Sequence, residues 1–185
     1  MYRCVCGSLP VFVISMAVAG CSGTGAAMTG GRAAMNLFKK DSLLKISLDG
    51  QEAKQDKLRK AATGYSRWEI KEPVSTAPKL QFDITEPDKF GRITMVSVSI
   101  FQKFEADYSG QAEFTVVARD VNKPEAQMKP GTTYDLGRPG EGFRIFNYKN
   151  EDVSGVELKP GMQYMMTLTI KADKSETAQV FFKTR

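Results

Sequence analysis

The sequence has no histidine, and its 3 cysteines, Cys4, Cys6 and Cys21, all lie within the first 21 of its 185 residues. The absence of histidine removes the commonest general base, the commonest zinc ligand and every Ser-His-Asp or Cys-His arrangement. The absence of cysteine after Cys21 excludes disulfides from the rest of the chain, although roughly 160 residues can bury a sufficient core without them. We therefore expect one domain with no catalytic residue, no metal and no cofactor.

Long apolar runs are also missing. The longest, from Leu9 to Val18, is shorter than the roughly 20 residues that a membrane-spanning helix requires. The formal net charge is +5 and the sequence pI is about 9.1. In an exported chain this basic balance favours solubility or an anionic envelope surface, and we expect no nucleic-acid partner.

A short motif ends this apolar run. Arg3 precedes Leu9 to Val18, and Val18-Ala19-Gly20-Cys21 then places two small residues before a cysteine. The segment resembles the signal peptide and lipobox of bacterial lipoproteins. The resemblance implies cleavage before Cys21, a diacylglycerol on its thiol and acylation of the freed amine, which together form a stable membrane anchor. Ser22, where an Asp would favour retention in the inner membrane, implies the outer membrane. The alternative is an ordinary secretory signal.

Composition divides the chain into four segments. Residues 1–20 are the expected signal peptide, residues 21–35 a flexible tether, residues 36–63 a short helical or irregular segment, and residues 64–185 a β-sandwich domain. Within the third segment, residues 51–62 (QEAKQDKLRKAA) are good helix formers with almost no apolar face, so we expect a short exposed helix. Its basic side chains form either a solvated face or a contact with anionic lipid; they are Lys54, Lys57, Arg59 and Lys60.

After Gly64 the apolar residues alternate with polar ones at period two, the spacing of a β-strand with one buried face. The alternating sets are Trp68 and Ile70; Leu80, Phe82 and Ile84; Val96, Val98 and Ile100; Phe114, Val116 and Ala118; Phe143 and Ile145; Met162, Tyr164, Met166, Leu168 and Ile170; and Ala178, Val180 and Phe182. Many short strands with turn signals between them predict an all-β fold, an antiparallel β-sandwich or barrel whose last two strands form a hairpin.

The run Val156 to Tyr164 (VELKPGMQY) and the strands around it resemble the end of a fibronectin type III or immunoglobulin-like domain. In that family a Leu-x-Pro-Gly-x-x-Tyr run carries the corner between two strands. The resemblance implies that Leu158 lies in the core, that Pro160-Gly161 makes the turn, and that the Tyr164 hydroxyl bonds back to the corner backbone.

Two features depart from the family. The only tryptophan, Trp68, precedes the strand that would carry the family's core tryptophan. Residues 129–134 (KPGTTY) also echo residues 159–164 (KPGMQY), so the motif marks either one specific corner or a more general β-turn.

Three loops carry candidate binding groups. Acidic side chains at Asp83, Glu86 and Asp88, and Asp120 with Asn122, are too sparse for the six to eight oxygens that calcium takes. The glycine-rich loop 137–142 (GRPGEG) lacks the Lys-Ser/Thr ending of a phosphate-binding loop. Binding residues concentrate on such loops, so it becomes the candidate binding site, with Arg138, Phe143, Phe146 and Tyr148 as its anchors. The alternative is that the aromatic rings fill the core and Arg138 is solvated.

Together these features favour an outer-membrane lipoprotein with a non-catalytic binding or structural role, facing the periplasm or the cell surface, with an envelope protein as partner. One alternative is a lipoprotein subunit of a secretion or conjugation machine. Another is a hydrolase that uses carboxylates alone, such as a glycosidase, which needs two carboxylates across a cleft.

Overall fold

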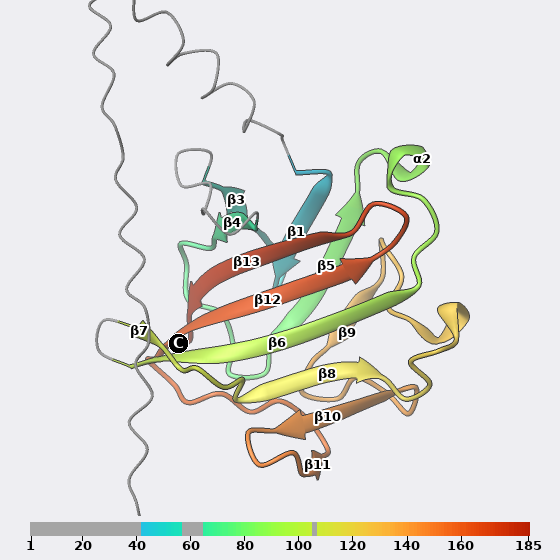
Figure 1. Cartoon of the computed structure of the whole chain (residues 1–185). Coiled ribbons are helices and arrows are strands. Elements are labelled where there is room, and N and C mark those ends of the chain that lie inside the picture. Colours follow the sequence, from blue (N-terminus) through green and yellow to red (C-terminus); the bar gives the residue numbers. More distant parts are fainter. Residues whose placement is uncertain (1–41, 57–64, 105–106) are drawn as a thin grey trace, which may run out of the picture.

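The computed structural model describes residues 42–56, 65–104 and 107–185. The signal peptide, Cys21, the tether and the second half of the expected helix, residues 57–62, lie outside these residues. The described part is an all-β sandwich of two sheets, the predicted fold class, in an arrangement consistent with immunoglobulin and fibronectin type III-like domains (Figure 1).

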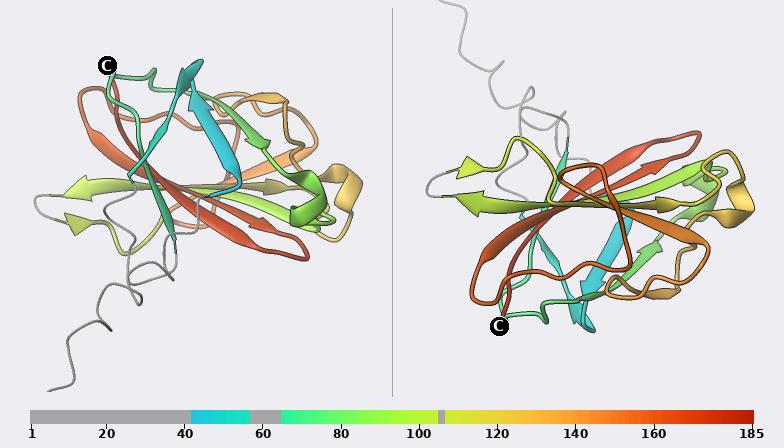
Figure 2. Two further views of the ribbon diagram at one scale, coloured as in Figure 1. Left: turned by 90° about the horizontal axis from the view of Figure 1, so that it is seen from above. Right: turned by 90° about the horizontal axis from the view of Figure 1, so that it is seen from below.

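The smaller sheet has four strands in the order β2-β1-β5-β9. Their bounds are β1 Leu44–Leu48, β2 Gln51–Glu52, β5 Lys79–Ile84 and β9 Thr133–Asp135. The strand β5 pairs antiparallel with β1 over five residues and with β9 over three. Figure 2 shows β1 and β5 as a separate layer on one side of the larger sheet.

The larger sheet has the strand order β11-β10-β8-β6-β12-β13-β4-β3. The bounds are β3 Lys54–Gln55, β4 Ser66–Glu69, β6 Met95–Phe104, β8 Phe114–Ala118, β10 Phe143–Asn147, β11 Asp152–Val153, β12 Gln163–Lys171 and β13 Glu176–Lys183. A short strand β7 (Asp107–Tyr108) folds back on the end of β6. Two short helical turns, α2 (Pro87–Phe90) and η1 (Pro124–Ala126), lie in connections.

One pairing departs from a purely antiparallel sandwich. The strand β4 runs parallel to β13, with Trp68 opposite Val180. The single tryptophan is buried there, in β4 rather than in β6, and its indole N–H donates to the Ser66 hydroxyl at 3.0 Å. The predicted hairpin of the last two strands is confirmed: β12 pairs with β13 over eight residues.

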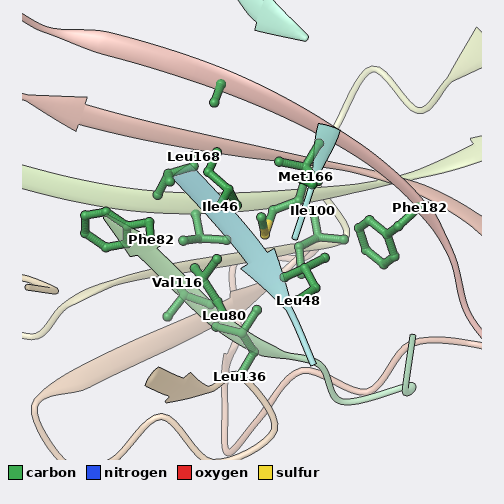
Figure 3. Packing of buried hydrophobic residues seen from close by; sticks show 14 of the residues in the cluster. Ile46, Leu48, Leu80, Phe82, Ile100, Val116, Leu136, Met166, Leu168 and Phe182 are labelled. Atoms are coloured by element: carbon green, nitrogen blue, oxygen red, sulfur yellow. The ribbon is translucent and has the colours of Figure 1, made fainter. Parts of the chain in front are cut away.

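The core lies between the two sheets and follows the predicted alternation. Val96, Val98 and Ile100 of β6 are at most 1% exposed, whereas Ser97 and Ser99 face outward. Figure 3 shows the opposed side chains of the two layers. The smaller sheet contributes Ile46, Leu48, Leu80 and Phe82, and the larger sheet Ile100, Val116, Met166, Leu168 and Phe182.

The structure corrects the boundary placed at residue 64. Leu44, Ile46 and Leu48 of β1 are at most 2% exposed and pack in the same core as the later strands. Leu44, Ile46 and Leu48 alternate with Lys45 and Ser47 at the period two of a strand, so the start of the domain lies before residue 44 and not after Gly64.

The expected helix over residues 51–62 is wrong where the structure describes it. Gln51–Glu52 pairs with β1, and Lys54–Gln55 pairs with β4, so this stretch passes from one sheet to the other. The bend falls at buried Ala53, whose N–H donates to the Ile46 carbonyl at 2.8 Å. Helix propensity is a weak preference, and hydrogen bonds to strands on both sides override it.

Both Lys-Pro-Gly segments form the same corner. The Tyr164 hydroxyl accepts the Lys159 N–H at 2.9 Å, and the Tyr134 hydroxyl accepts the Lys129 N–H at 2.7 Å. Gly161 and Gly131 have φ of 72° and 78°, a left-handed conformation that glycine adopts without strain and that follows proline in a type II turn. The echo between residues 129–134 and 159–164 is therefore a repeated local structure.

The two corners differ in their surroundings. Tyr164 is fully buried and stacks on Phe182 with ring centroids 5.8 Å apart, whereas Tyr134 is half-buried. At the buried corner the Thr184 hydroxyl accepts the Met162 N–H at 3.1 Å and donates to the Lys159 carbonyl at 2.6 Å. Leu158 is also in the core, so all the residues predicted for this corner lie together.

Candidate functional site

The glycine-rich loop 137–142 borders an open depression of about 500 Å³ at the end of β10 and β11. This size falls within the range of small binding sites, although the depression is wide open to solvent. The lining residues are Arg119, Arg138, Pro139, Gly140, Glu141, Phe143, Ile145, Asp152, Val153 and Ser154. Two tight turns shape the loop: the Arg138 N–H donates to the Asp135 carbonyl at 3.0 Å, and the Phe143 N–H to the Gly140 carbonyl at 3.2 Å.

A second open depression adjoins the first. It is lined by Thr76, Ala77, Asp135, Gly137, Arg138, Ser154, Gly155, Val156 and Glu157. Arg138 and Ser154 line both depressions and therefore stand on the ridge between them. The guanidinium of Arg138 makes no hydrogen bond or ion pair with the residues that the structure describes, so its donors are free to meet a ligand.

Two glycines give this ridge its shape. A Cβ on Gly155 would lie 1.9 Å from the Gly137 carbonyl oxygen, and a Cβ on Gly137 would lie 2.8 Å from the Ala77 Cβ. The two backbones therefore touch directly, and the Val156 N–H donates to the Leu136 carbonyl at 2.9 Å beside them. Any side chain at position 155 would force the two segments apart.

The first depression carries charge of both signs. Arg119 Nε donates to the Glu141 carbonyl at 3.0 Å, which fixes this side chain across the loop. Arg144 Nε donates a hydrogen bond to Asp152 at 3.0 Å, and the two side chains form an ion pair, so the Asp152 charge is already balanced. Arg119, Arg138 and the Glu141 carboxylate remain as the charges available to a ligand.

Of the four anchors predicted from the sequence, the structure brings two together. Arg138 and Phe143 line the first depression, and the Phe143 ring meets Tyr134 edge-on with centroids 5.5 Å apart. Phe146 points to the opposite face of β10, where the Arg144 guanidinium lies 4.8 Å from its ring centroid. Tyr148 lies in the turn after β10 and is 53% exposed. Alternation along the strand separates Phe146 from Phe143 and removes it from the site.

Sequence reasoning missed Arg119, Asp152 and Ser154. The β8–β10 register places Ala118 opposite Phe143, and this brings Arg119 beside the loop, where its N–H donates to the Gly142 carbonyl at 2.8 Å. The β10–β11 pairing places Val153 opposite Ile145, on the face of Phe143, and Asp152 opposite Phe146 at the rim of the depression. No local pattern in the sequence marks these residues, because strand pairing alone assembles them.

The chain matches no protein-family model and no curated protein. Within residues 42–56, 65–104 and 107–185, none of the helices has the length and apolar character needed to cross a membrane.

The remaining candidate groups lie apart from the depressions. Glu86 pairs with Lys89, and Asp120 pairs with Lys123 at 3.1 Å and accepts the Asn122 N–H at 3.3 Å. Asp83 faces Gln81, whose side-chain amide donates to it at 3.4 Å. In the described part of the chain no three His, Cys, Asp or Glu side chains converge as metal ligands. Of the expected basic cluster, Lys54 is exposed on β3, and Lys57, Arg59 and Lys60 lie outside the described residues.

Proposed function

We propose that this chain is an outer-membrane lipoprotein, anchored through Cys21, whose sandwich binds an envelope protein without turnover. The VAGC motif supports the anchor. The observation that carries the binding role is the free Arg138 guanidinium on the ridge between two depressions, on a loop held by backbone hydrogen bonds. Arginine with a neighbouring aromatic ring is a frequent composition of binding hot spots.

The anchor is tested by Cys21→Ser. The substitution removes the thiol that would carry the diacylglycerol, so the protein should leave the membrane fraction and appear in the soluble envelope fraction. Ser22→Ala is the matched control and should stay with the membranes. A Cys21→Ser protein that is processed normally and stays on outer membranes through a salt wash contradicts the lipid anchor.

The binding role is tested by cross-linking in intact cells and identifying the captured envelope proteins. Arg138→Ala should reduce capture of a specific partner by about tenfold or more if Arg138 is a hot spot. Arg92→Ala removes an exposed arginine from the loop after α2, outside both depressions, and should capture normally. Equal capture by all three proteins excludes the loop as the binding site.

A carboxylate-only hydrolase is the second candidate, because Glu141 and Asp152 line the same depression. Asp152 is already bound by Arg144, which leaves Glu141 as the carboxylate open to a ligand. Hydrolysis of envelope glycans that is lost in Glu141→Gln and kept in Glu113→Gln would favour the hydrolase over the binding module.

A further inference from the structure

We propose that the partner presents an acidic residue with apolar neighbours, carried on an extended segment, to the first depression. This inference rests on the proposed binding role of the loop and names the chemistry of its ligand. The carboxylate of the segment pairs with Arg138 and Arg119, and the adjacent apolar side chain lies on the surface formed by Phe143 and Val153.

The charge of the depression favours a carboxylate. Among the residues that the structure describes, none binds the Arg138 guanidinium, and Arg119 donates only through Nε, to the Glu141 carbonyl. Asp152 is balanced by Arg144, so two arginines against the Glu141 carboxylate leave one net positive charge. A guanidinium presents paired N–H donors in the plane that a carboxylate accepts.

Two apolar side chains also line the depression. Phe143 and Val153 are half-buried and keep part of their surface open toward the depression, above buried Ile145. A bare phosphate or a free carboxylate would leave this surface in water. A peptide that places an apolar side chain beside its carboxylate uses both features, and burial of that side chain adds to the affinity.

The second depression determines which charge the next part of the bound segment can carry. Beyond the Gly137–Gly155 ridge it presents Asp135 and Glu157, with Asp135 accepting the Gly137 N–H at 3.0 Å. A second acidic residue placed there would face like charge. The segment therefore carries its carboxylate over the first depression and a neutral or basic residue over the second.

Fluorescence anisotropy with the full-length protein tests the proposal, using three dye-labelled peptides of sequence Gly-Leu-X-Leu-Gly in which X is Glu, Gln or Lys. The Glu peptide should bind about tenfold or more tightly than the Lys peptide, with the Gln peptide between them. The reason is that the two arginines attract a negative residue X, are indifferent to the charge of a neutral one and repel a positive one. The preference should weaken as salt is added.

Variants identify where the peptide binds. Arg138→Gln and Arg119→Gln should each remove most of the preference for the Glu peptide, and Arg92→Gln should keep it. Val153→Ser should weaken the Glu and Gln peptides to a similar degree, because it acts on the apolar contact. Inorganic phosphate, added as a competitor, should displace the Glu peptide only at concentrations well above those of unlabelled peptide.

Three outcomes overturn the proposal. They are equal affinity for the Glu and Lys peptides, no binding of the Glu peptide at about 1 mM protein, and phosphate competing as well as the unlabelled peptide. If one of these occurs while capture in cells still depends on Arg138, the ligand chemistry is wrong and the binding role stands. If capture is also independent of Arg138, both are wrong.

Discussion

The same corner occurs twice in this protein, once buried and once half-buried, so the stability cost of one substitution can be compared at the two positions. Tyr164→Phe and Tyr134→Phe each remove one hydroxyl oxygen that accepts a lysine backbone N–H, at 2.9 Å and 2.7 Å respectively. The ring remains in both variants, so the change isolates the hydrogen bond. The cost then depends on whether water can reach the N–H that loses its partner.

Burial sets the order of the two costs. Tyr164 is fully buried against Phe182, so its hydrogen bond with the N–H of exposed Lys159 is partly buried. Leaving this donor without a partner should cost about 1–3 kcal/mol. Tyr134 is half-buried and the Lys129 N–H lies at an exposed position, so water can replace the lost hydroxyl. Its removal should cost about 0.5 kcal/mol, near the lower limit for a hydrogen bond.

The measurement is urea unfolding of the full-length protein and the two variants, followed by the fluorescence of the single Trp68 and by circular dichroism. The dependence of free energy on urea should be the same in all three proteins, so that midpoints compare directly. A loss below about 0.5 kcal/mol for Tyr164→Phe, or a larger loss for Tyr134→Phe than for Tyr164→Phe, would refute the reasoning.

Three further predictions concern the turn at Asp49, the ridge and the first strand. Burial raises the pKa of Asp49, but hydrogen bonds from the Ser75 and Lys79 N–H groups at 2.6 Å and 2.8 Å outweigh it and hold the pKa below its ordinary 3.8. Its contribution to stability is therefore present above that value and lost as pH falls through the lower folded-state pKa. Asn tolerates the φ of 51° at this position, so Asp49→Asn tests the carboxylate alone. The substitution should lower the free energy of unfolding by about 1 kcal/mol near neutral pH, and by less in acid. A difference in denaturation midpoint that stays constant at all pH values contradicts this. Gly155→Ala should destabilise the protein by about 1–3 kcal/mol, because the new Cβ would contact Gly137. Gly142→Ala, whose Cβ meets nothing within 4 Å, is the control. Equal melting temperatures for the two variants would show that the two backbone segments can move apart without cost. A chain that begins at residue 64 should lose its cooperative melting, because Leu80 and Phe82 of β5 would lose the β1 partner that covers them; a sharp transition in calorimetry would place β1 outside the core.

The sequence alone determined those features that repeat within a few residues. The alternation in β6, β12 and β13 shows which side chains face the core, because a strand turns each successive residue to the opposite face. The corner at Tyr164 could also be predicted, since Pro160-Gly161 sets the turn and the tyrosine reaches back only five residues to Lys159. The glycine-rich loop was found through its composition, together with Arg138 and Phe143.

Only the tertiary structure decided what depends on pairing between distant segments. Residues 51–55 have the composition of a helix, yet they pair with strands of both sheets, because backbone hydrogen bonds to β1 and β4 outweigh a weak local preference. The site depends on the β8–β10–β11 register, which brings Arg119 and Val153 to the loop and turns Phe146 away. The ridge under Arg138 requires the backbones of Gly137 and Gly155 to touch. These relations join residues far apart along the chain, so no period in the sequence carries them.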